Sequence, residues 1–267
     1  LDPAEQAKQL IKEIKAFDAE GDGDSIIIAS GGDGTVGAVA SALQGSDIPL
    51  GIIPRGTANA FSVALGIPTG VKAACTNLLL GNLRRVDVAL CNNQPMILLA
   101  GIGFEAGMVD KASRELKNIL GPMAYIFSGA RQFVDQLPFQ ATMLIDGEQV
   151  QIDASAITIA NAAPATSVMA QGFGEVIPDD GLLEVIIASP KDRISGLSVL
   201  SSLAWSALKS SNANHNNLAC FRTKQIQLEL KEVQKLVIDG EILDAQTVTV
   251  TVNPQALQVV APIPLKS

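Results

Sequence analysis

Two glycine-containing stretches near the start of the chain carry the residue types that bind phosphate. The first reads Gly31-Gly32-Asp33-Gly34-Thr35-Val36-Gly37 and lies between an apolar run and an alanine-rich stretch. Glycine lets a ligand approach the backbone closely, and the N–H groups at a helix start present positive potential to phosphate oxygens. A tight strand-to-helix turn that needs glycine for its geometry alone is the alternative interpretation.

The aspartate in this stretch helps to distinguish between two kinds of phosphate-binding site. Gly32-x-Gly34-x-x-Gly37 matches a dinucleotide-binding fingerprint, which calls for an acidic residue about 20 positions later to bind the ribose. The segment Ile48 to Gly56 contains no acidic residue. Asp33 would also repel a bare pyrophosphate, unless a divalent cation lies between the two anions. The pattern therefore favours metal-assisted phosphoryl transfer over dinucleotide binding.

The second stretch, Pro54-Arg55-Gly56-Thr57-Ala58-Asn59, again joins an apolar run to a helical pattern. Thr57 and Asn59 can donate side-chain hydrogen bonds, and Arg55 adds a cation. If the two preceding strands are parallel neighbours, both turns lie at one edge of the sheet, where open α/β sheets bind ligands. A helix-capping role for Thr57 is the alternative.

Alternating apolar runs and helical patterns predict a parallel sheet in the first part of the chain. A capping box at Asp2-Pro3-Ala4-Glu5 predicts a helix that extends to Phe17. The continuous apolar run Ser25–Ser30 is typical of a strand covered on both faces. A helix to Leu43, a strand over Ile48–Ile53, and helices over Ala58–Leu65 and Thr69–Leu80 follow. We interpret residues 1–85 as a Rossmann-like α/β nucleotide-binding domain.

From residue 86 onward, short apolar runs predict mainly antiparallel strands. The expected strands cover Val86–Leu90, Met96–Ala100, Phe139–Ile145, Gln149–Ile159, Leu182–Ala188, Ile226–Leu230, Leu236–Ile238, Thr247–Val252 and Leu257–Val260. Asp146-Gly147 and Asp239-Gly240 are hairpin-turn signals. Two helical stretches, Glu105–Leu137 and Arg193–Leu208, interrupt the strands. We interpret the region from residue 86 to residue 267 as a mainly antiparallel β domain, either a sandwich or an open barrel.

Composition excludes several classes of function. The 267 residues are 48% apolar with a net charge of −8, which argues against nucleic-acid partners and a polybasic grip on lipid. Cys75, Cys91 and Cys220 form no CxxC pair, and His215 is the only histidine. We expect a reducing compartment, buried thiols, and neither a zinc site nor a disulfide scaffold. No apolar run predicts a membrane-spanning helix. The start at Leu1, without Met, indicates a piece of a longer chain.

The two glycine stretches together, with Phe61, resemble those of the bacterial diacylglycerol kinase-like lipid kinases, a family related to sphingosine and ceramide kinases. NAD kinase is similar in the first stretch and differs in the second. The resemblance continues in order through Arg85-Val86-Asp87, Pro178-Asp179-Asp180-Gly181-Leu182-Leu183-Glu184-Val185 and Val237-Ile238-Asp239-Gly240-Glu241. It implies a nucleotide-binding α/β domain followed, over residues 86–267, by a β-sandwich domain that binds the lipid substrate.

The resemblance implies an ATP- and Mg2+-dependent kinase that phosphorylates the hydroxyl of a diacylglycerol-like lipid in phospholipid metabolism. Asp33 and Asp87 would join a water–metal network, and Glu241 would be the general base. Asp180, with the backbone carbonyls of Ile177 and Leu182, would bind a structural Mg2+. The residues implied to hold ATP are Gly31, Gly32, Asp33, Gly34, Thr35, Val36, Gly37, Gly56, Thr57 and Asn59. From the residues alone, Glu148 stands in nearly the same context as Glu241.

Departures from the family pattern keep other functions open. The family has Asn-Glu where this chain has Gly37 and Ala38, and an Asp where it has Ala60. A non-catalytic nucleotide or lipid sensor and an NAD kinase-like enzyme are therefore the alternatives.

The expected partner is a lipid substrate at a membrane surface. The protein is then cytoplasmic and peripherally membrane-associated, with a homodimer as one assembly. Candidates for an apolar lipid groove are Phe104 to Phe133 and the helix with Ile194, Leu197, Leu200, Leu203 and Trp205, for which core packing is the alternative.

Overall fold

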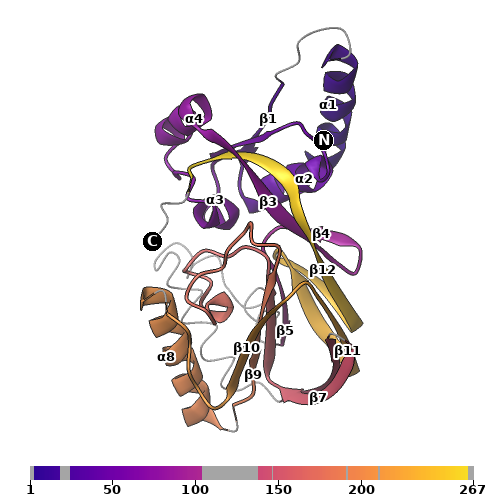
Figure 1. Ribbon diagram of the computed structural model, residues 1–267, viewed down its shortest axis with the longest axis vertical. Helices are drawn as coiled ribbons and strands as arrows, with labels where there is room; N and C mark the ends of the chain where they lie inside the picture. Colours follow the sequence, from indigo (N-terminus) through magenta and orange to yellow (C-terminus); the bar gives the residue numbers. More distant parts are fainter. Residues whose placement is uncertain are drawn as a thin grey trace. The chain divides into compact units, whose positions relative to one another are not determined.

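A computed structural model describes residues 3–18, 25–103, 138–145, 147–190, 192–209 and 211–263. The chain forms two compact units (Figure 1). The first comprises Leu1–Val88, Pro178–Gly181 and Asn253–Ser267, and the second comprises Ala89–Ile177 and Leu182–Val252. The first unit thus contains two segments from late in the chain that lie beyond the sequence-based boundary at residue 85.

The first unit is a small parallel sheet with helices. Its elements are α1 (Pro3–Asp18), β1 (Ile27–Gly31), α2 (Asp33–Leu43), β2 (Leu50–Pro54), α3 (Ala60–Ala64) and α4 (Val71–Leu80), with parts of β3 (Asn82–Cys91) and β12 (Glu241–Ala261). β1 pairs with β2 in parallel, and β2 pairs in parallel with β12 where Leu50 faces Val259. Helix α2 packs against β1 and β2, and α4 packs against β2. The predicted α/β architecture of this region is confirmed.

The first strand is less buried than the sequence predicts. Ile27 and Ala29 are buried, whereas Ile28 is 49% exposed, so β1 alternates instead of being covered on both faces. The reason is its position at the end of the strand order, beside β2. A Cβ on Gly51, the residue paired with Ile28, would meet Leu78 of α4 at 2.7 Å. Helix α4 therefore covers β2, and Ile28 on the edge strand keeps half of its surface exposed.

The second unit is built from antiparallel strands, as predicted. Its further elements are β4 (Gln94–Met96), β5 (Leu99–Gly103), β6 (Phe139–Ile145), β7 (Glu148–Ala154), β8 (Ala156–Ala160), η1 (Val168–Ala170), β9 (Leu183–Ala188), α8 (Arg193–Lys209), β10 (Leu218–Thr223) and β11 (Gln225–Ile238). Strand order runs β12-β11-β5-β8-β9-β10. The register of β11 shifts between Glu229 and Gln234, and β11 pairs with β6 before this bulge and with β5 after it. The bulge bends β11, so that this one long strand pairs with β6 over one part of its length and with β5 over another.

The core of the second unit is formed by side chains from strands β8 and β9 and from the hairpin of β11 and β12. Ile157, Val185 and Ile187 face it, together with Leu228, Val248 and Val250 from the long hairpin of β11 and β12. On the other face of β8 and β9, Ala156, Ile186 and Ala188 pack against η1 and α8 (Figure 1). This double coverage explains why all six residues of β9 are buried.

Other element boundaries also differ from the sequence-based expectation. The expected strand Gln149–Ile159 is divided at Ser155, and the two short strands expected before Ile238 form one strand, β11. Strand β10 has no counterpart in the prediction. The expected helix over Glu105–Leu137 lies outside the described residues. Among the residues that the structure describes, no helix is long and apolar enough to cross a membrane.

Candidate functional site

The two glycine turns begin at neighbouring residues. In the parallel pair of β1 and β2, Gly31 faces Pro54, so both turns leave the sheet at the same edge. The Arg55 N–H donates a 2.8 Å hydrogen bond to the Gly31 carbonyl. The structure therefore brings the two glycine turns together at one edge of the sheet, as we expected from the sequence.

The turns touch through their glycine backbones. A Cβ added to Gly56 would lie 2.7 Å from the Gly32 Cα, and one on Gly32 would lie 3.2 Å from the Gly56 Cα. Close backbone packing thus explains glycine at these two positions. Gly34 differs, because a Cβ there would meet nothing within 4 Å. The space beside Gly34 is available for a ligand that approaches the backbone.

Helix α2 starts inside the first turn. Its N-cap is Gly32, which supplies no side-chain cap, and the Val36 N–H donates to the Gly32 carbonyl at 3.0 Å. The first N–H groups of an α-helix have no acceptor within the helix. Residues 33–35 thus offer donors and the positive end of the helix dipole to an anion. Val36 itself is buried in the core.

Asp33 and Asn59 connect the turns to helix α3. An Asp33 Oδ1 accepts a 3.4 Å hydrogen bond from the Phe61 N–H. Asn59 caps α3 in a left-handed conformation, with φ of 48°. Its Oδ1 accepts from the Gly56 N–H and its Nδ2 donates to the Gly56 carbonyl, both at 2.8 Å. Asn59, and not Thr57, therefore holds the second turn in shape, and Thr57 is exposed.

Asp87 is 1% exposed and holds distant parts of the chain together in the first unit. One carboxylate oxygen accepts from the Gly181 N–H and the other from the Gln255 N–H, each at 2.7 Å. The Asp87 N–H donates to the Pro178 carbonyl at 2.8 Å. The structure thus assigns Asp87 a direct structural contact, while its place in a water–metal network remains a prediction.

The segment of the predicted structural Mg2+ site is fixed next to Asp87. Arg84 donates to Asp179 at 2.8 Å and to the Pro262 carbonyl at 3.2 Å. Gly181 has φ of +74°, a conformation that favours glycine. The described residues contain no group of three or more His, Cys, Asp or Glu side chains that could hold a metal. The ligand set of Asp180 with the carbonyls of Ile177 and Leu182 remains a prediction.

Glu241 follows a tightly anchored hairpin turn in the second unit. Asp239 and Gly240 have φ of 50° and 97°, which confirms the predicted turn. The Asp239 carboxylate accepts N–H donors from Ile97 at 2.7 Å, Leu98 at 2.9 Å and Leu99 at 3.0 Å. Glu241 is exposed and faces Ile238 across the hairpin. Sequence reasoning missed the role of Asp239, although the Asp-Gly turn signal marked its position.

Two thiols have pKa values well above the ordinary value for cysteine. Burial, and then the charge of Asp239, raises the pKa of Cys91 to about 12. Burial, and then the charge of Glu184, raises the pKa of Cys220 to about 11. The thiols of Cys75, Cys91 and Cys220 are all free. Only Cys91 is fully buried, so the expectation of three buried thiols is wrong for Cys75 and Cys220, which are partly exposed.

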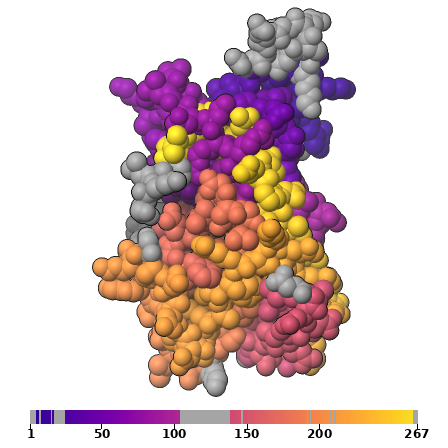
Figure 2. Space-filling model, viewed as in Figure 1, coloured from indigo at the N-terminus to yellow at the C-terminus, as the bar shows by residue number. Residues whose placement is uncertain are grey.

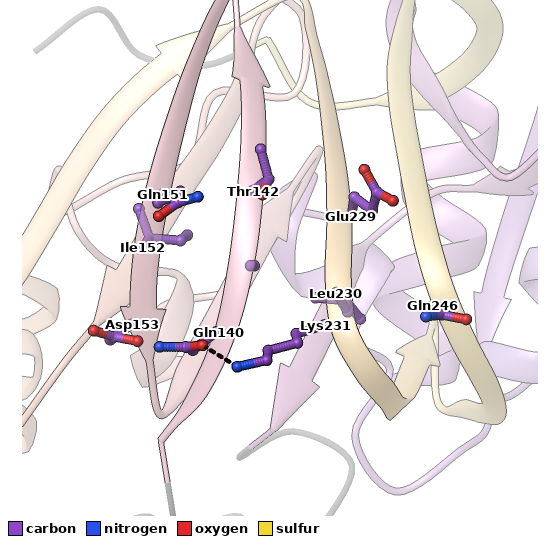
Figure 3. Close-up of a pocket in the computed structure, with 10 residues that line it drawn as sticks. Gln140, Thr142, Gln151, Ile152, Asp153, Glu229, Leu230, Lys231 and Gln246 are labelled. Carbon is purple, nitrogen blue, oxygen red and sulfur yellow. Dashed lines mark hydrogen bonds between the residues drawn. The ribbon is translucent and has the colours of Figure 1, made fainter.

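A separate polar hollow of about 660 Å³ lies on the strands β6, β7, β11 and β12 (Figure 3). Its walls are Gln140, Thr142, Gln151, Asp153, Glu229, Lys231 and their neighbours. Lys231 donates to Gln140 at 2.8 Å, which joins two adjacent strands. It contains none of the predicted site residues.

Two family models match consecutive parts of the chain. Residues 1–91 match a model described as the diacylglycerol kinase catalytic domain. Residues 99–261 match a model described as the YegS C-terminal NAD kinase β-sandwich-like domain.

Curated relatives match most of the chain or nearly all of it. The protein sll0036 of Synechocystis sp. is 52% identical over 261 residues, which are 97% of this chain and 60% of that protein. A probable lipid kinase YegS-like protein of Pseudomonas aeruginosa is 30% identical over 96% of this chain and 81% of its own length. The diacylglycerol kinase of Bacillus subtilis is 29% identical over 81% of this chain and 71% of its own length.

Solved structures share the fold. The structure of a diacylglycerol kinase from Bacillus anthracis has a TM-score of 0.65 at 20% identity and covers 89% of this chain and 76% of its own. Another structure from that organism has a TM-score of 0.75 at 23% identity and covers 98% of this chain and 83% of its own.

Proposed function

Because the chain belongs to the diacylglycerol kinase family of lipid kinases, we propose that it transfers the γ-phosphoryl group of ATP to a hydroxyl of a diacylglycerol-like lipid. The observation that carries this proposal is the backbone contact between Gly32 and Gly56 at the shared edge of β1 and β2. That contact sets two loops and the start of α2 around one position.

The residues at this edge fit the phosphates of ATP. The free space beside Gly34 admits a phosphate group to the backbone, and the first amides of α2 supply donors. Thr57 adds an exposed hydroxyl. Asp33 suits a Mg2+ that is bound mainly by phosphate and water, since such ions take only one or two protein carboxylates. When bound, the ion would neutralise charge on the phosphate oxygens.

In the proposed reaction, the lipid hydroxyl oxygen forms a bond to the γ-phosphorus while the bond to the β,γ-bridging oxygen breaks and ADP leaves. The hydroxyl proton passes to the Glu241 carboxylate. The anchored Asp239-Gly240 turn supports this role, because a base must be held in position to act.

The replacement of family carboxylates supports a second candidate, a nucleotide sensor that does not catalyse transfer. Ala60 begins α3, and Ala38 lies within α2, close in sequence to Asp33. Fewer carboxylates would weaken the positioning of a metal ion while leaving the glycine loops intact.

Labelled ATP with a panel of acceptors tests the proposal. The panel contains diacylglycerol, sphingosine, ceramide and NAD, each with Mg2+ or Mn2+. We expect label in a lipid. Label in NAD would support the NAD kinase-like alternative. Nucleotide binding by calorimetry with no labelled acceptor under any metal would support the sensor and overturn the kinase proposal.

A further inference from the structure

One face of helix α8 is buried against the second unit. Gly196, Val199, Leu203 and Ser206 are buried. Val199 and Leu203 pack with Met169, Ile186 and Ala188 into a cluster of the second unit. Leu200 packs at the margin of this cluster, so part of the expected lipid-binding helix is ordinary core.

The outer face of α8 is apolar as well. Four large side chains point to solvent on this helix: Ile194 is 81% exposed, Leu197 57%, Trp205 61% and Leu208 78%. Their spacing places them along one side of the helix, with the exposed Ser198 and Ser201 between them. We call these four residues the α8 stripe. Figure 2 shows α8, in orange, at the surface of its unit.

Isolated exposed apolar residues are ordinary on protein surfaces, whereas several large apolar side chains on one side of a single helix mark an interaction site. The stripe is about 20 Å long, given the rise of 1.5 Å per residue. Within α8 the only charged residues are Arg193 and Lys209, at its two ends, and none is acidic. The preceding Asp192 is engaged as a helix cap, because its Oδ1 accepts the Ser195 N–H at 2.7 Å.

The charge and the aromatic residue point to one kind of partner. The chain has a net charge of −8, yet this apolar helix contains no acidic residue and carries the Lys209 cation in its last turn. The Lys209 ammonium lies 5.3 Å from the centre of the Trp205 ring. Tryptophan and lysine together are favoured at the boundary between lipid tails and headgroups, where the ring is half-buried and the cation meets anionic phosphates.

We propose that the α8 stripe docks this protein onto the surface of a bilayer that contains anionic lipid, with α8 parallel to the membrane plane. The inference rests on the proposed function, in which the acceptor lipid resides in a membrane. Docking through α8 would keep the enzyme at the surface from which it takes that lipid.

Trp205 makes the proposal directly measurable, because it is the only tryptophan of the chain. Vesicles of phosphatidylcholine with phosphatidylglycerol are added to the full chain, and emission and acrylamide quenching are recorded. We expect a blue shift and protection from acrylamide. Vesicles of phosphatidylcholine alone, which lack anionic lipid, or added salt, which screens charge, should weaken both effects because the attraction of the Lys209 cation to anionic phosphates is lost or reduced.

Variants that keep Trp205 can show which side chains contact the vesicle surface. The double variant Leu197→Ser and Leu208→Ser should bind vesicles about 100-fold more weakly, given about tenfold for each large apolar side chain. Val233→Ser is the matched control, because Val233 is 58% exposed in the same unit but lies on β11. Co-sedimentation with vesicles gives the affinities.

Three outcomes would overturn the docking proposal. One is equal binding by the double variant and the Val233→Ser control. Another is a Trp205 that is already shielded from acrylamide without vesicles, which would mean that the chain itself covers the stripe. The third is a blue shift that depends on protein concentration alone, with a dimer in light scattering, which would assign the stripe to a second copy.

Phosphorylation of a short-chain diacylglycerol dissolved in water separates this proposal from the proposed function. Under docking, the double variant keeps its activity on the dissolved lipid and loses activity on vesicle-borne lipid. If the wild-type chain binds vesicles through α8 but phosphorylates neither form, the kinase proposal fails and the docking surface stands. Equal loss on both forms would overturn a docking role.

Discussion

Gly32 and Gly56 lie backbone against backbone, so closely that a Cβ on Gly56 would come within 2.7 Å of the Gly32 Cα. The two residues are 24 positions apart in the sequence but belong to turns that leave adjacent, parallel strands. Because neither turn can move away without breaking this contact, the amides proposed to bind phosphate and the Asp33 carboxylate are held together before any ligand arrives.

The first prediction concerns Gly56→Ala, which puts a methyl group against fixed backbone atoms. We expect a loss of about 2–3 kcal/mol in the free energy of unfolding, because the two turns must separate. Denaturant unfolding measures this change. Nucleotide affinity should fall in parallel. A variant with wild-type stability would show that the turns are not in contact.

Gly34→Ala separates ligand binding from packing. A Cβ at Gly34 meets no protein atom within 4 Å, and the same is true of Gly70 at the start of α4. We expect Gly34→Ala to weaken ATP binding at least about tenfold at unchanged melting temperature, since the methyl group displaces a phosphate from the amides. Gly70→Ala is the matched control. Calorimetry that shows equal ATP affinity for the two variants would place the phosphates elsewhere.

Glu241→Gln should lower kcat about 100- to 10,000-fold while the KM for ATP stays nearly unchanged, because the amide cannot accept the hydroxyl proton. Glu148→Gln is a close control, as Glu148 is also exposed and also follows a turn glycine with positive φ, Gly147. Steady-state kinetics with lipid substrate compare the two. If both variants keep wild-type kcat, Glu241 is not the base.

Asp239→Asn tests whether the turn positions Glu241. The carboxylate accepts donors from Ile97, Leu98 and Leu99, and in the variant the amide nitrogen would face one of these N–H groups. We expect a loss of about 1–3 kcal/mol in unfolding free energy. A fall in kcat beyond that of a matched destabilised variant, with nucleotide affinity retained, indicates positioning. Unchanged kcat would limit Asp239 to stability.

Alkaline pH should destabilise the fold through its thiols. The pKa of Cys91 is raised from its ordinary value of 9.0 to about 12 in the folded protein. Between these values the unfolded chain loses the thiol proton first, so stability is fully present below pH 9 and falls as pH approaches 12. Unfolding measured across this range should show a shallower fall in Cys91→Ala. An identical pH dependence would contradict this burial.

Local patterns in the sequence are sufficient to predict the elements that position the two glycine turns. The helical spacing before residue 18, the apolar runs and the glycine turns each reflect near-neighbour physics, and α1, β1, α2, β2 and α4 follow them closely. Coverage of β1 could not be predicted this way, because the exposure of Ile28 depends on which helix reaches the edge strand.

Long-range contacts account for what local patterns did not predict. Asp87 binds the amides of Gly181 and Gln255, residues 94 and 168 positions away, and no local signal marks either partner. The bulge that lets β11 change neighbours likewise depends on strands from distant segments. The sequence left lipid binding and core packing as alternatives for the apolar residues of α8, and only the packing shows which of them are core and which form the stripe.

The sequence by itself determined the two glycine turns and the order of α/β and antiparallel regions, because these depend on backbone freedom and on periodicity between neighbours. The tertiary structure alone decided that Gly32 meets Gly56, that Asp87 and Asp239 bind backbone amides, and that α8 turns Trp205 outward. Those outcomes depend on which distant segments pack together, and packing is a property of the whole folded chain.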